Sequence, residues 1–194
     1  GRDYITERIC GLRFKINAKT FFQTNSTQAE KLFYVVKKFL EPSKNDILYD
    51  LYSGIGTIGQ ILSKNVKKVV GIDIVEDSIN FANENSKLNN LSNTKYFSGD
   101  MKDIFTQAFI KENGKPSVSI VNPPREGIDK KVIEKIIDTK PKKIVYVSCN
   151  SSTLARDLFI FQKTYEISKL QTVDMFPHTS HVENVVLLKQ LIDV

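Results

Sequence analysis

Short apolar runs alternate with helical patterns along most of the chain, and this alternation is the feature that most constrains its fold. The runs are nearly continuous in apolar residues, which is typical of strands that are buried on both faces of a parallel sheet. The segments between them carry apolar residues at helical spacing. The predicted strands are 47–52, 68–74, 95–98, 118–121 and 144–147, and the predicted helices are 57–63, 76–88, 130–137 and 153–161.

The pattern changes near the C-terminal end, where the strand-like runs 169–175 and 182–189 follow each other without a helix between them. Two consecutive strands without a crossover predict an antiparallel pair at the end of the sheet. The predicted fold class is therefore α/β, with a doubly wound, Rossmann-like, mostly parallel sheet of seven strands and an antiparallel C-terminal strand.

The first part of the chain differs from the rest. Residues 1–25 lack a helical period, and we expect them to be a lead-in segment from a preceding domain. Thr27 and Glu30 form a capping-box pattern that predicts the start of a helix, which ends before Pro42. Residues 26–194 are expected to form one domain.

The composition excludes several classes of protein. The 194 residues carry 28 Lys and Arg against 22 Asp and Glu, a formal net charge of +6, and 41% of them are hydrophobic. This is too apolar for a disordered chain, and no run approaches the roughly 20 residues that span a bilayer. Two cysteines, Cys10 and Cys149, are too few for a disulfide framework. We expect a cytoplasmic protein without membrane contact, and the basic excess is compatible with a polyanionic partner.

Asp50 and Asp73 lie in the last residues of two predicted strands and Asp100 follows the next one, at the edge where ligands bind in doubly wound sheets. The turn at 54–59 matches the GxGxxG pattern, so a dinucleotide such as NAD is one candidate ligand. Asp73 is placed to accept both hydroxyls of a ribose. Acidic walls suit a cationic sulfonium better than a pyrophosphate, so the three acids together favour S-adenosylmethionine.

A second group of candidate residues follows the strand at 118–121. Asn122, Pro123 and Pro124 predict a rigid, extended loop with free carbonyl groups. Asn-Pro-Pro followed by an aromatic residue is the usual pattern of enzymes that methylate exocyclic amines, but the fourth residue here is Arg125. This argues against stacking on a flipped adenine, and amine methylation remains an alternative.

The last candidates are a thiol and a histidine-containing segment. Cys149 lies between a predicted strand and a predicted helix, whose N-terminus would lower the pKa of the thiol and favour a nucleophile over a buried small residue. The segment His178-x-x-His181-x-Glu183 is a poor metal site because the chain has two histidines and no further ligand cluster. We expect no metal.

Five motifs occur in order along the chain: FFQTN at 21–25, DLYSGIGT at 50–57, NPPREG at 122–127, VSCN at 147–150 and HVE at 181–183. Together they resemble the S-adenosylmethionine-dependent RNA uracil-C5 methyltransferases, which act on ribosomal or transfer RNA. The resemblance implies that residues 26–194 are the catalytic domain, with Cys149 as nucleophile and Glu183 as general base. It also implies a cofactor site lined by Gln23, Tyr52, Ser53, Gly54, Thr57, Asp73, Asp100 and Asn122, and a substrate site with Phe21 and Arg125.

The implied reaction transfers a methyl group to C5 of a uridine. C5 of uracil is too weak a nucleophile to attack a methyl sulfonium unaided, and addition of the Cys149 thiolate to C6 would activate it. Glu183 would then remove the C5 proton. The base would have to leave its stack, where Phe21 would stabilise it and Arg125 would hold a phosphate. The expected partner is RNA, with ribosomal RNA preferred over transfer RNA.

Two features depart from the family pattern. The family usually has Asp where this chain has Asn122, so one negative charge near cofactor and base is missing. Family members also carry an N-terminal RNA-binding domain of the OB type, some with an iron–sulfur cluster, and we expect neither here because the chain resembles the catalytic part of a longer protein. The alternatives are an amine methyltransferase, a non-catalytic RNA-binding remnant of the fold and, more remotely, a nicotinamide enzyme.

Overall fold

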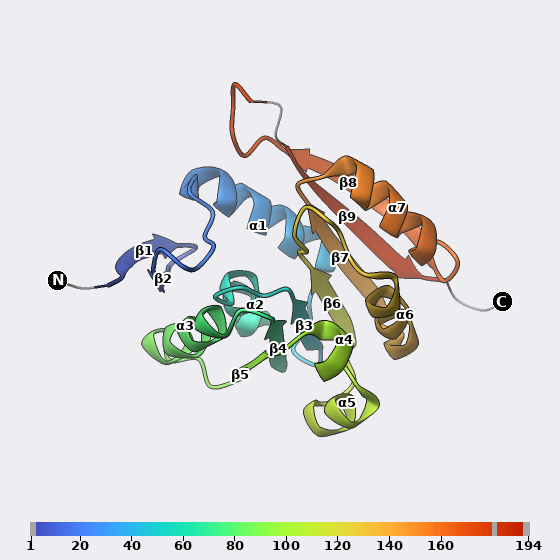
Figure 1. Cartoon of the computed structure of the whole chain (residues 1–194), viewed down its shortest axis with the longest axis horizontal. Coiled ribbons are helices and arrows are strands. Elements are labelled where there is room, and N and C mark those ends of the chain that lie inside the picture. The colour runs from blue at the N-terminus through green and yellow to red at the C-terminus, as the bar shows by residue number, and fades with distance from the viewer. Residues whose placement is uncertain (1–2, 180–181, 192–194) are drawn as a thin grey trace.

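A seven-stranded sheet forms the centre of the protein, whose computed structural model describes residues 3–179 and 182–191 (Figure 1). The strand order is β5-β4-β3-β6-β7-β9-β8. The strands are β3 (Ile47–Leu51), β4 (Lys68–Asp73), β5 (Thr94–Ser98), β6 (Val118–Val121), β7 (Lys143–Ser148), β8 (Tyr165–Val173) and β9 (Glu183–Gln190).

The direction of the strands confirms the predicted fold class. β3 to β7 run parallel to one another, whereas β9 runs antiparallel to both of its neighbours, β7 and β8. The antiparallel strand is not at the edge of the sheet, because β9 inserts between β7 and β8. β9 follows β8 in sequence, yet it separates β8 from β7 in the sheet.

Helices cover both faces of the sheet, as expected for a doubly wound fold. Side chains alternate along β3, so that Leu48 packs with α1, α2 and α3, and Tyr49 packs with α4, α5, α6 and α7. Within 3–179 and 182–191, no helix is long and apolar enough to cross a membrane. The helices are α1 (Ser26–Leu40), α2 (Thr57–Leu62), α3 (Glu76–Leu88), α4 (Met101–Ile104), α5 (Gln107–Asn113), α6 (Lys130–Thr139) and α7 (Ser151–Phe161), and the 3-10 turn η1 (Ser63–Asn65) follows α2.

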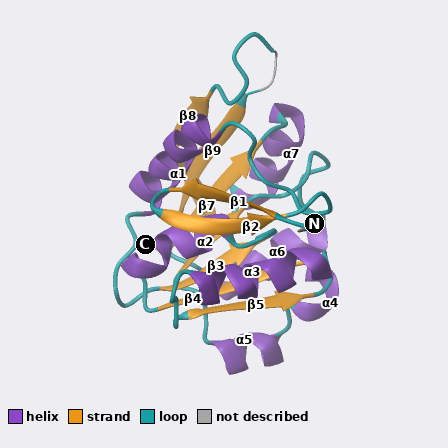
Figure 2. Cartoon of the chain, turned by 90° about the vertical axis from the view of Figure 1, so that its left-hand side faces the viewer, coloured by secondary structure: helices purple, strands orange, loops and turns teal. Residues whose placement is uncertain are grey.

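A β-hairpin precedes α1 and packs on the same core (Figure 2). β1 (Ile5–Ile9) pairs with β2 (Leu12–Ile16), and the Phe14 side chain is fully buried. The backbone of β2 is tied to α3, because the Lys15 amide donates to Asn85 Oδ1 at 2.7 Å and the Asn85 amide donates back to the Lys15 carbonyl at 3.2 Å. The origin of 1–25 in a preceding domain remains a prediction, but this segment packs on the domain that follows it.

The start of α1 differs from the predicted capping box. Asn25 is the N-cap, and its Oδ1 accepts from the Gln28 amide at 3.2 Å. Glu30 does not reach back to the helix start, since its Oε1 accepts from the amide of Cys10 in the β1–β2 turn at 2.6 Å. The capping-box prediction at Thr27 and Glu30 is therefore wrong, because a contact distant in sequence uses the Glu30 carboxylate.

Candidate active site

A cavity of about 930 Å³ opens at the carboxyl ends of the parallel strands. Its walls come from the loops after β3, β4, β5, β6 and β7, the segment before α1 and the residues around the start of β9. All twelve site residues predicted from the sequence line this cavity: Phe21, Gln23, Tyr52, Ser53, Gly54, Thr57, Asp73, Asp100, Asn122, Arg125, Cys149 and Glu183.

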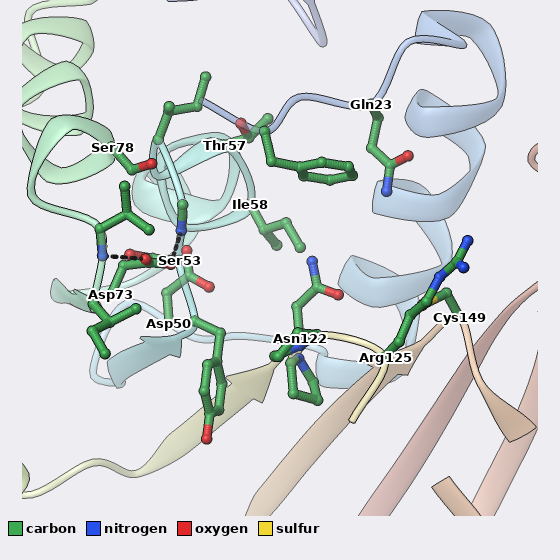
Figure 3. A pocket seen from close by; sticks show the side chains of 18 of the residues that line it. Gln23, Asp50, Ser53, Thr57, Ile58, Asp73, Ser78, Asn122, Arg125 and Cys149 are labelled. Carbon is green, nitrogen blue, oxygen red and sulfur yellow. Dashed lines mark hydrogen bonds between the residues drawn. The ribbon is translucent and has the colours of Figure 1, made fainter. Parts of the chain in front are cut away.

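The cavity has two chemically different ends (Figure 3). We call the part around Asp50, Asp73 and Asp100 the acidic end, and the part around Cys149, Arg125 and Glu183 the thiol end. Figure 3 shows the side chains of Asp50 and Asp73 on one side, Arg125 and Cys149 on the other, and Asn122 and Gln23 between them. A volume of about 930 Å³ is within the usual range for sites that hold small-molecule ligands.

Asp73 fixes the two loops that form the acidic end. Its Oδ2 accepts from the Gly54 amide at 2.8 Å, and its Oδ1 accepts from the Val75 amide at 2.9 Å. Each carboxylate oxygen keeps a lone pair for a further donor, such as a sugar hydroxyl. Gly54 has φ of +52°, and a Cβ there would meet no atom within 4 Å, so the backbone at this turn is open.

The other glycines of the GxGxxG pattern serve the protein core instead. A Cβ on Gly56 would lie 2.6 Å from Tyr96 Cζ, and one on Gly59 would lie 2.7 Å from Asp50 Oδ2. These two glycines make room for a buried ring and a buried carboxylate, so they do not form a cradle for a pyrophosphate. This geometry argues against the dinucleotide alternative.

Asp50 is the most buried acid of the site, with 1% of its surface exposed. Its Oδ2 accepts from the Gly59 amide at 2.9 Å, whereas Asp50 Oδ1 and the nearby Ser53 Oγ have no hydrogen-bond partner within the part of the chain that the structure describes. Burial, with a smaller contribution from the charge of Asp73, raises the pKa of Asp50 to about 7, although the Gly59 amide opposes this. Unpaired buried oxygens that line a cavity fit a ligand with polar donors.

Asp100 and Tyr52 complete the acidic end. Asp100 is the N-cap of α4, with its Oδ1 accepting from the Lys102 amide at 2.8 Å. Tyr52 lies directly after β3 in a left-handed conformation with φ of +62°. Burial raises the pKa of the Tyr52 hydroxyl above its usual value, with a further contribution from the charge of Asp100, so the phenol stays protonated.

At the thiol end, strand pairing brings Cys149 and Glu183 together. Ser148, the last residue of β7, pairs with Asn184 of β9. The residue after Ser148 is Cys149 and the residue before Asn184 is Glu183, so these two residues lie next to each other at this edge of the sheet. Residues 34 positions apart in sequence are thus joined by the antiparallel pairing of β7 with β9.

The predicted lowering of the Cys149 pKa is wrong, because the net shift is upward. Burial raises the pKa of the thiol, and the charge of Glu183 raises it further, while Arg125 lowers it by its charge and by a hydrogen bond. The net shift is upward because desolvation of a half-buried thiolate outweighs these favourable contacts. Burial also raises the pKa of Glu183 to about 7.

The segment before α1 closes one side of the cavity. The Asn25 side-chain amide donates to the Met175 carbonyl at 3.0 Å and so joins this segment to the loop between β8 and β9. Phe21 lines the cavity with 71% of its surface exposed.

The histidine prediction falls partly outside the described residues, which include His178 but not His181. Among the described residues, no group of three His, Cys, Asp or Glu could hold a metal.

Some lining residues were not predicted. Ile74 and Val75 follow Asp73 at the acidic end, and both are exposed, with 64% and 43% of their surface accessible. Met175 and Phe176 line the cavity from the loop after β8. The signal that could have identified Ile74 and Val75 is an apolar pair directly after a strand, since such residues are exposed unless a ligand covers them.

The chain is similar to known proteins along almost its whole length. A family model described as tRNA (Uracil-5-)-methyltransferase matches residues 1–191. The chain is 46% identical over 189 residues to an uncharacterized RNA methyltransferase of Bacteroides thetaiotaomicron, covering 97% of this chain and 42% of that protein. A second uncharacterized RNA methyltransferase, from Porphyromonas gingivalis, is 48% identical over 190 residues, covering 97% of this chain and 41% of that protein.

A solved structure is similar over nearly the whole chain. The tRNA (uracil-54, C5)-methyltransferase of Pyrococcus abyssi, in complex with S-adenosyl-L-homocysteine, superposes with a TM-score of 0.83 at 35% identity, covering 97% of this chain and 45% of that one. The chain spans about two fifths of the length of the curated relatives named above. With the family model matched over nearly every residue, the chain belongs to the tRNA (uracil-5-)-methyltransferase family.

Proposed function

We propose that this chain is the catalytic part of an S-adenosylmethionine-dependent enzyme that methylates C5 of a uridine in RNA through a covalent bond to Cys149. The observation that carries the proposal is that Cys149 and Glu183 lie next to the Ser148–Asn184 pair, at one end of a cavity whose other end is acidic. The family to which the chain belongs, and the S-adenosyl-L-homocysteine bound to the similar Pyrococcus protein, support the same reaction.

The acidic end fits S-adenosylmethionine. In this proposal the Asp73 carboxylate accepts the ribose hydroxyls and the exposed Ile74 and Val75 contact an apolar ring face. The unpaired oxygens of Asp50 and Ser53 accept from polar donors of the amino-acid arm. When bound, S-adenosylmethionine supplies an electrophilic methyl group, which the activated C5 carbon accepts. Asn122 lies between this end and the thiol end.

Cys149 supplies the electrons that C5 of uracil lacks. The thiolate forms a bond to C6, and the electron pair of the C5–C6 double bond moves to C5 and the C4 carbonyl, which gives an enolate. Arg125 stabilises the thiolate before the attack, since its guanidinium lowers the pKa of Cys149. The thiol proton leaves to solvent, so that Glu183 stays ionised for the later step.

Glu183 completes the reaction. After the methyl group is on C5, the Glu183 carboxylate takes the C5 proton, the electron pair re-forms the C5–C6 double bond, and the bond from C6 to the Cys149 sulfur breaks. A carboxylate whose pKa burial raises to about 7 is a stronger base than an ordinary glutamate and is partly ionised at neutral pH. Loss of this proton from Glu183 to solvent then restores the starting state of the enzyme.

The RNA partner must present an unstacked base. The thiol end lies inside a cavity, so a uridine in a duplex would have to flip out to reach it. The exposed ring of Phe21 offers a stacking surface and Arg125 offers charge for a phosphate. Ribosomal RNA is the substrate that we predict, although the names of the family model and of the Pyrococcus structure refer to tRNA.

The experiment is a covalent trap with 5-fluorouridine RNA, because fluorine at C5 cannot be removed as a proton by Glu183. Ribosomal RNA fragments and transfer RNA transcripts are incubated in parallel with the chain and S-adenosylmethionine. We expect an RNA–protein adduct that survives denaturation and disappears in Cys149→Ser. Methyl transfer to RNA without any adduct would reject the covalent route, and N-methylated bases in the product would favour the amine methyltransferase.

A further inference from the structure

The loop after β6, residues 125–128, is held by the side chains of one helix. Asn150 Nδ2 and Thr153 Oγ1 each donate to the Arg125 carbonyl at 3.1 Å. Further along, α7 provides two adjacent charged residues, Arg156 and Asp157, which bind the next backbone groups of the loop. This loop has no strand or helix of its own, so α7 determines where it lies.

Asp157 is the buried centre of these contacts. None of its surface is exposed, and its Oδ2 accepts from the Ile128 amide at 2.8 Å and from the Tyr146 hydroxyl at 2.7 Å. Its Oδ1 accepts from Arg156 Nε at 2.9 Å. Arg156 Nη2 in turn donates to the carbonyls of Glu126 at 2.9 Å and Ile128 at 3.3 Å. The acid is therefore fully satisfied by groups that belong to the loop, to β7 and to its neighbour on α7.

Gly127 allows this close contact. It has φ of +75°, and a Cβ there would lie 2.6 Å from Arg156 Nη2 and 2.7 Å from Asp157 Oδ2. The Arg156 guanidinium and the Asp157 carboxylate thus contact the loop backbone at Gly127, where a larger residue would clash with them. Such contact between charged groups and a backbone restricts the loop more than ordinary packing does.

The same helix starts at the reactive thiol. α7 begins at Ser151, two residues after Cys149, and its N-cap is Asn150. Arg125, the first residue of the held loop, lies beside Cys149 in Figure 3, and both residues line the thiol end. One rigid helix therefore fixes the thiol at its start and the arginine-bearing loop along its side.

We propose that Arg156 and Asp157 are positioning residues that hold the 125–128 loop so that the Arg125 guanidinium faces the Cys149 sulfur. The proposal rests on the proposed function in one respect, namely that Cys149 is the nucleophile. Neither residue lines the cavity, so neither touches the reacting atoms. They act on the reaction through Arg125, whose charge offsets part of the upward shift that burial and Glu183 give to the pKa of the Cys149 thiol.

The test measures the thiol directly. Alkylation of Cys149 by iodoacetamide is followed against pH by mass spectrometry of the Cys149 peptide, without RNA or cofactor. The exposed Cys10, which lies in the β1–β2 turn outside the cavity, reports on the same sample as an internal reference. The variants are Arg156→Gln and Asp157→Asn, compared with Lys143→Gln, which removes a cation that binds one carboxylate and one backbone carbonyl at the opposite end of β7.

The direction of the shift separates positioning from simple charge. If the two residues acted on the thiol by charge alone, loss of Arg156 would raise the midpoint of the alkylation curve and loss of Asp157 would lower it. Positioning predicts that both variants raise the midpoint for Cys149, by about 0.5 to 1 pH unit, because both release Arg125. Arg125→Gln should give a similar rise, and adding Arg156→Gln to it should give no further change.

Unchanged midpoints in both variants, or shifts of opposite sign, would overturn the proposal. Arg156 is half exposed, so if Asp157→Asn does not fold, Arg156→Gln in the Arg125→Gln background keeps the test valid. A direct charge effect would still raise the midpoint in that background, whereas positioning predicts no further change. The outcome is independent of the covalent trap. If the wild-type chain forms no RNA adduct while the variants show the shifted midpoints, the proposed function alone is rejected. If the wild-type chain forms the adduct while the midpoints of the variants are unshifted, the positioning role alone is rejected.

Discussion

Glu183 is a buried carboxylate next to the thiol that it is proposed to serve, and its removal separates the steps of the reaction. Glu183→Gln keeps the shape of the side chain but cannot take the C5 proton. We expect turnover to fall by about 100-fold to 10,000-fold, while the adduct accumulates on ordinary uridine RNA. Denaturing gels with labelled RNA measure it, and the double variant with Cys149→Ser should show none. Turnover at the wild-type rate would contradict the role of Glu183.

Asn122 lies between the two ends of the cavity, where the family pattern usually has an acid. Asn122→Asp adds a negative charge that attracts the sulfonium of S-adenosylmethionine but not the neutral thioether of S-adenosylhomocysteine. Calorimetry should show a Kd for S-adenosylmethionine that is lower by about tenfold, the equivalent of about 1.4 kcal/mol, with little change for S-adenosylhomocysteine. Equal changes for both ligands would mean that charge is not the cause.

Asp50 makes stability depend on pH. Its pKa of about 7 in the folded state is above the ordinary 3.8, so the folded protein binds this proton more tightly than the unfolded chain does. The free energy of unfolding therefore falls as pH rises from about 4 to 7, by at most about 4 kcal/mol. Urea unfolding of Asp50→Asn should show a free energy of unfolding that depends less on pH in this range. Glu183→Gln should reduce the same pH dependence in part.

A matched acid gives the opposite sign. Burial raises the pKa of Asp46, but hydrogen bonds from Ser43 and Ser117 outweigh it, so the net pKa is lowered. Its contribution to stability is present above the unfolded pKa and is lost as pH falls through the folded one. Asp46 should therefore increase the free energy of unfolding as pH rises through about 4, and Asp46→Asn should remove this increase. A parallel response of the Asp46 and Asp50 variants would refute the assignment.

At the scale of elements, the contact between β4 and β5 requires a glycine. A Cβ on Gly71 in β4 would lie 2.2 Å from Cδ1 of the buried Tyr96 in β5. Gly71→Ala should destabilise the fold by about 1 to 3 kcal/mol, the usual cost of overpacking a core. Urea unfolding of Gly71→Ala with and without Tyr96→Leu tests the cause, because the smaller side chain should recover part of the loss. No recovery would exclude the ring as the cause.

The elements predicted from the sequence are those that carry long, regular patterns. α3 and β6 have the predicted bounds, because a full helical face and a continuous apolar run both leave a clear period. α4 and α5 were not predicted, since helices of four and seven residues show too little periodicity to be read from the sequence.

The candidate site was predictable as a location but not in its energetics. The strand-end motifs identified the lining residues because the carboxyl ends of parallel strands meet at one edge. The predicted direction of the Cys149 pKa shift was wrong because the shift depends on burial and on the charge of Glu183. Glu183 is brought next to the thiol by the pairing of β7 with β9. The contacts of Arg156 and Asp157 were missed for a similar reason, since they join α7 to a loop about 30 residues earlier in the chain.

At the scale of the whole molecule, the net charge of +6 is modest for binding a polyanion. We expect RNA binding to weaken as salt rises, because each neutralised phosphate releases counterions. Arg125→Gln should reduce the slope of log Kd against log salt by about one, as expected for one lost phosphate contact. Filter binding at several salt concentrations measures the slope. Lys143→Gln, at the opposite edge of the sheet, should leave it unchanged.

The insertion of β9 between β7 and β8 has a consequence for how the protein is made. Chains emerge from the ribosome N-terminus first, and Glu183 is on the last strand to emerge. Until then β7 and β8 have no partner to join them, and the thiol has no neighbouring base. A nascent chain that stops before residue 183 would therefore lack the carboxylate that we propose as the base, so the proposed thiol end is complete only after β9 has been made.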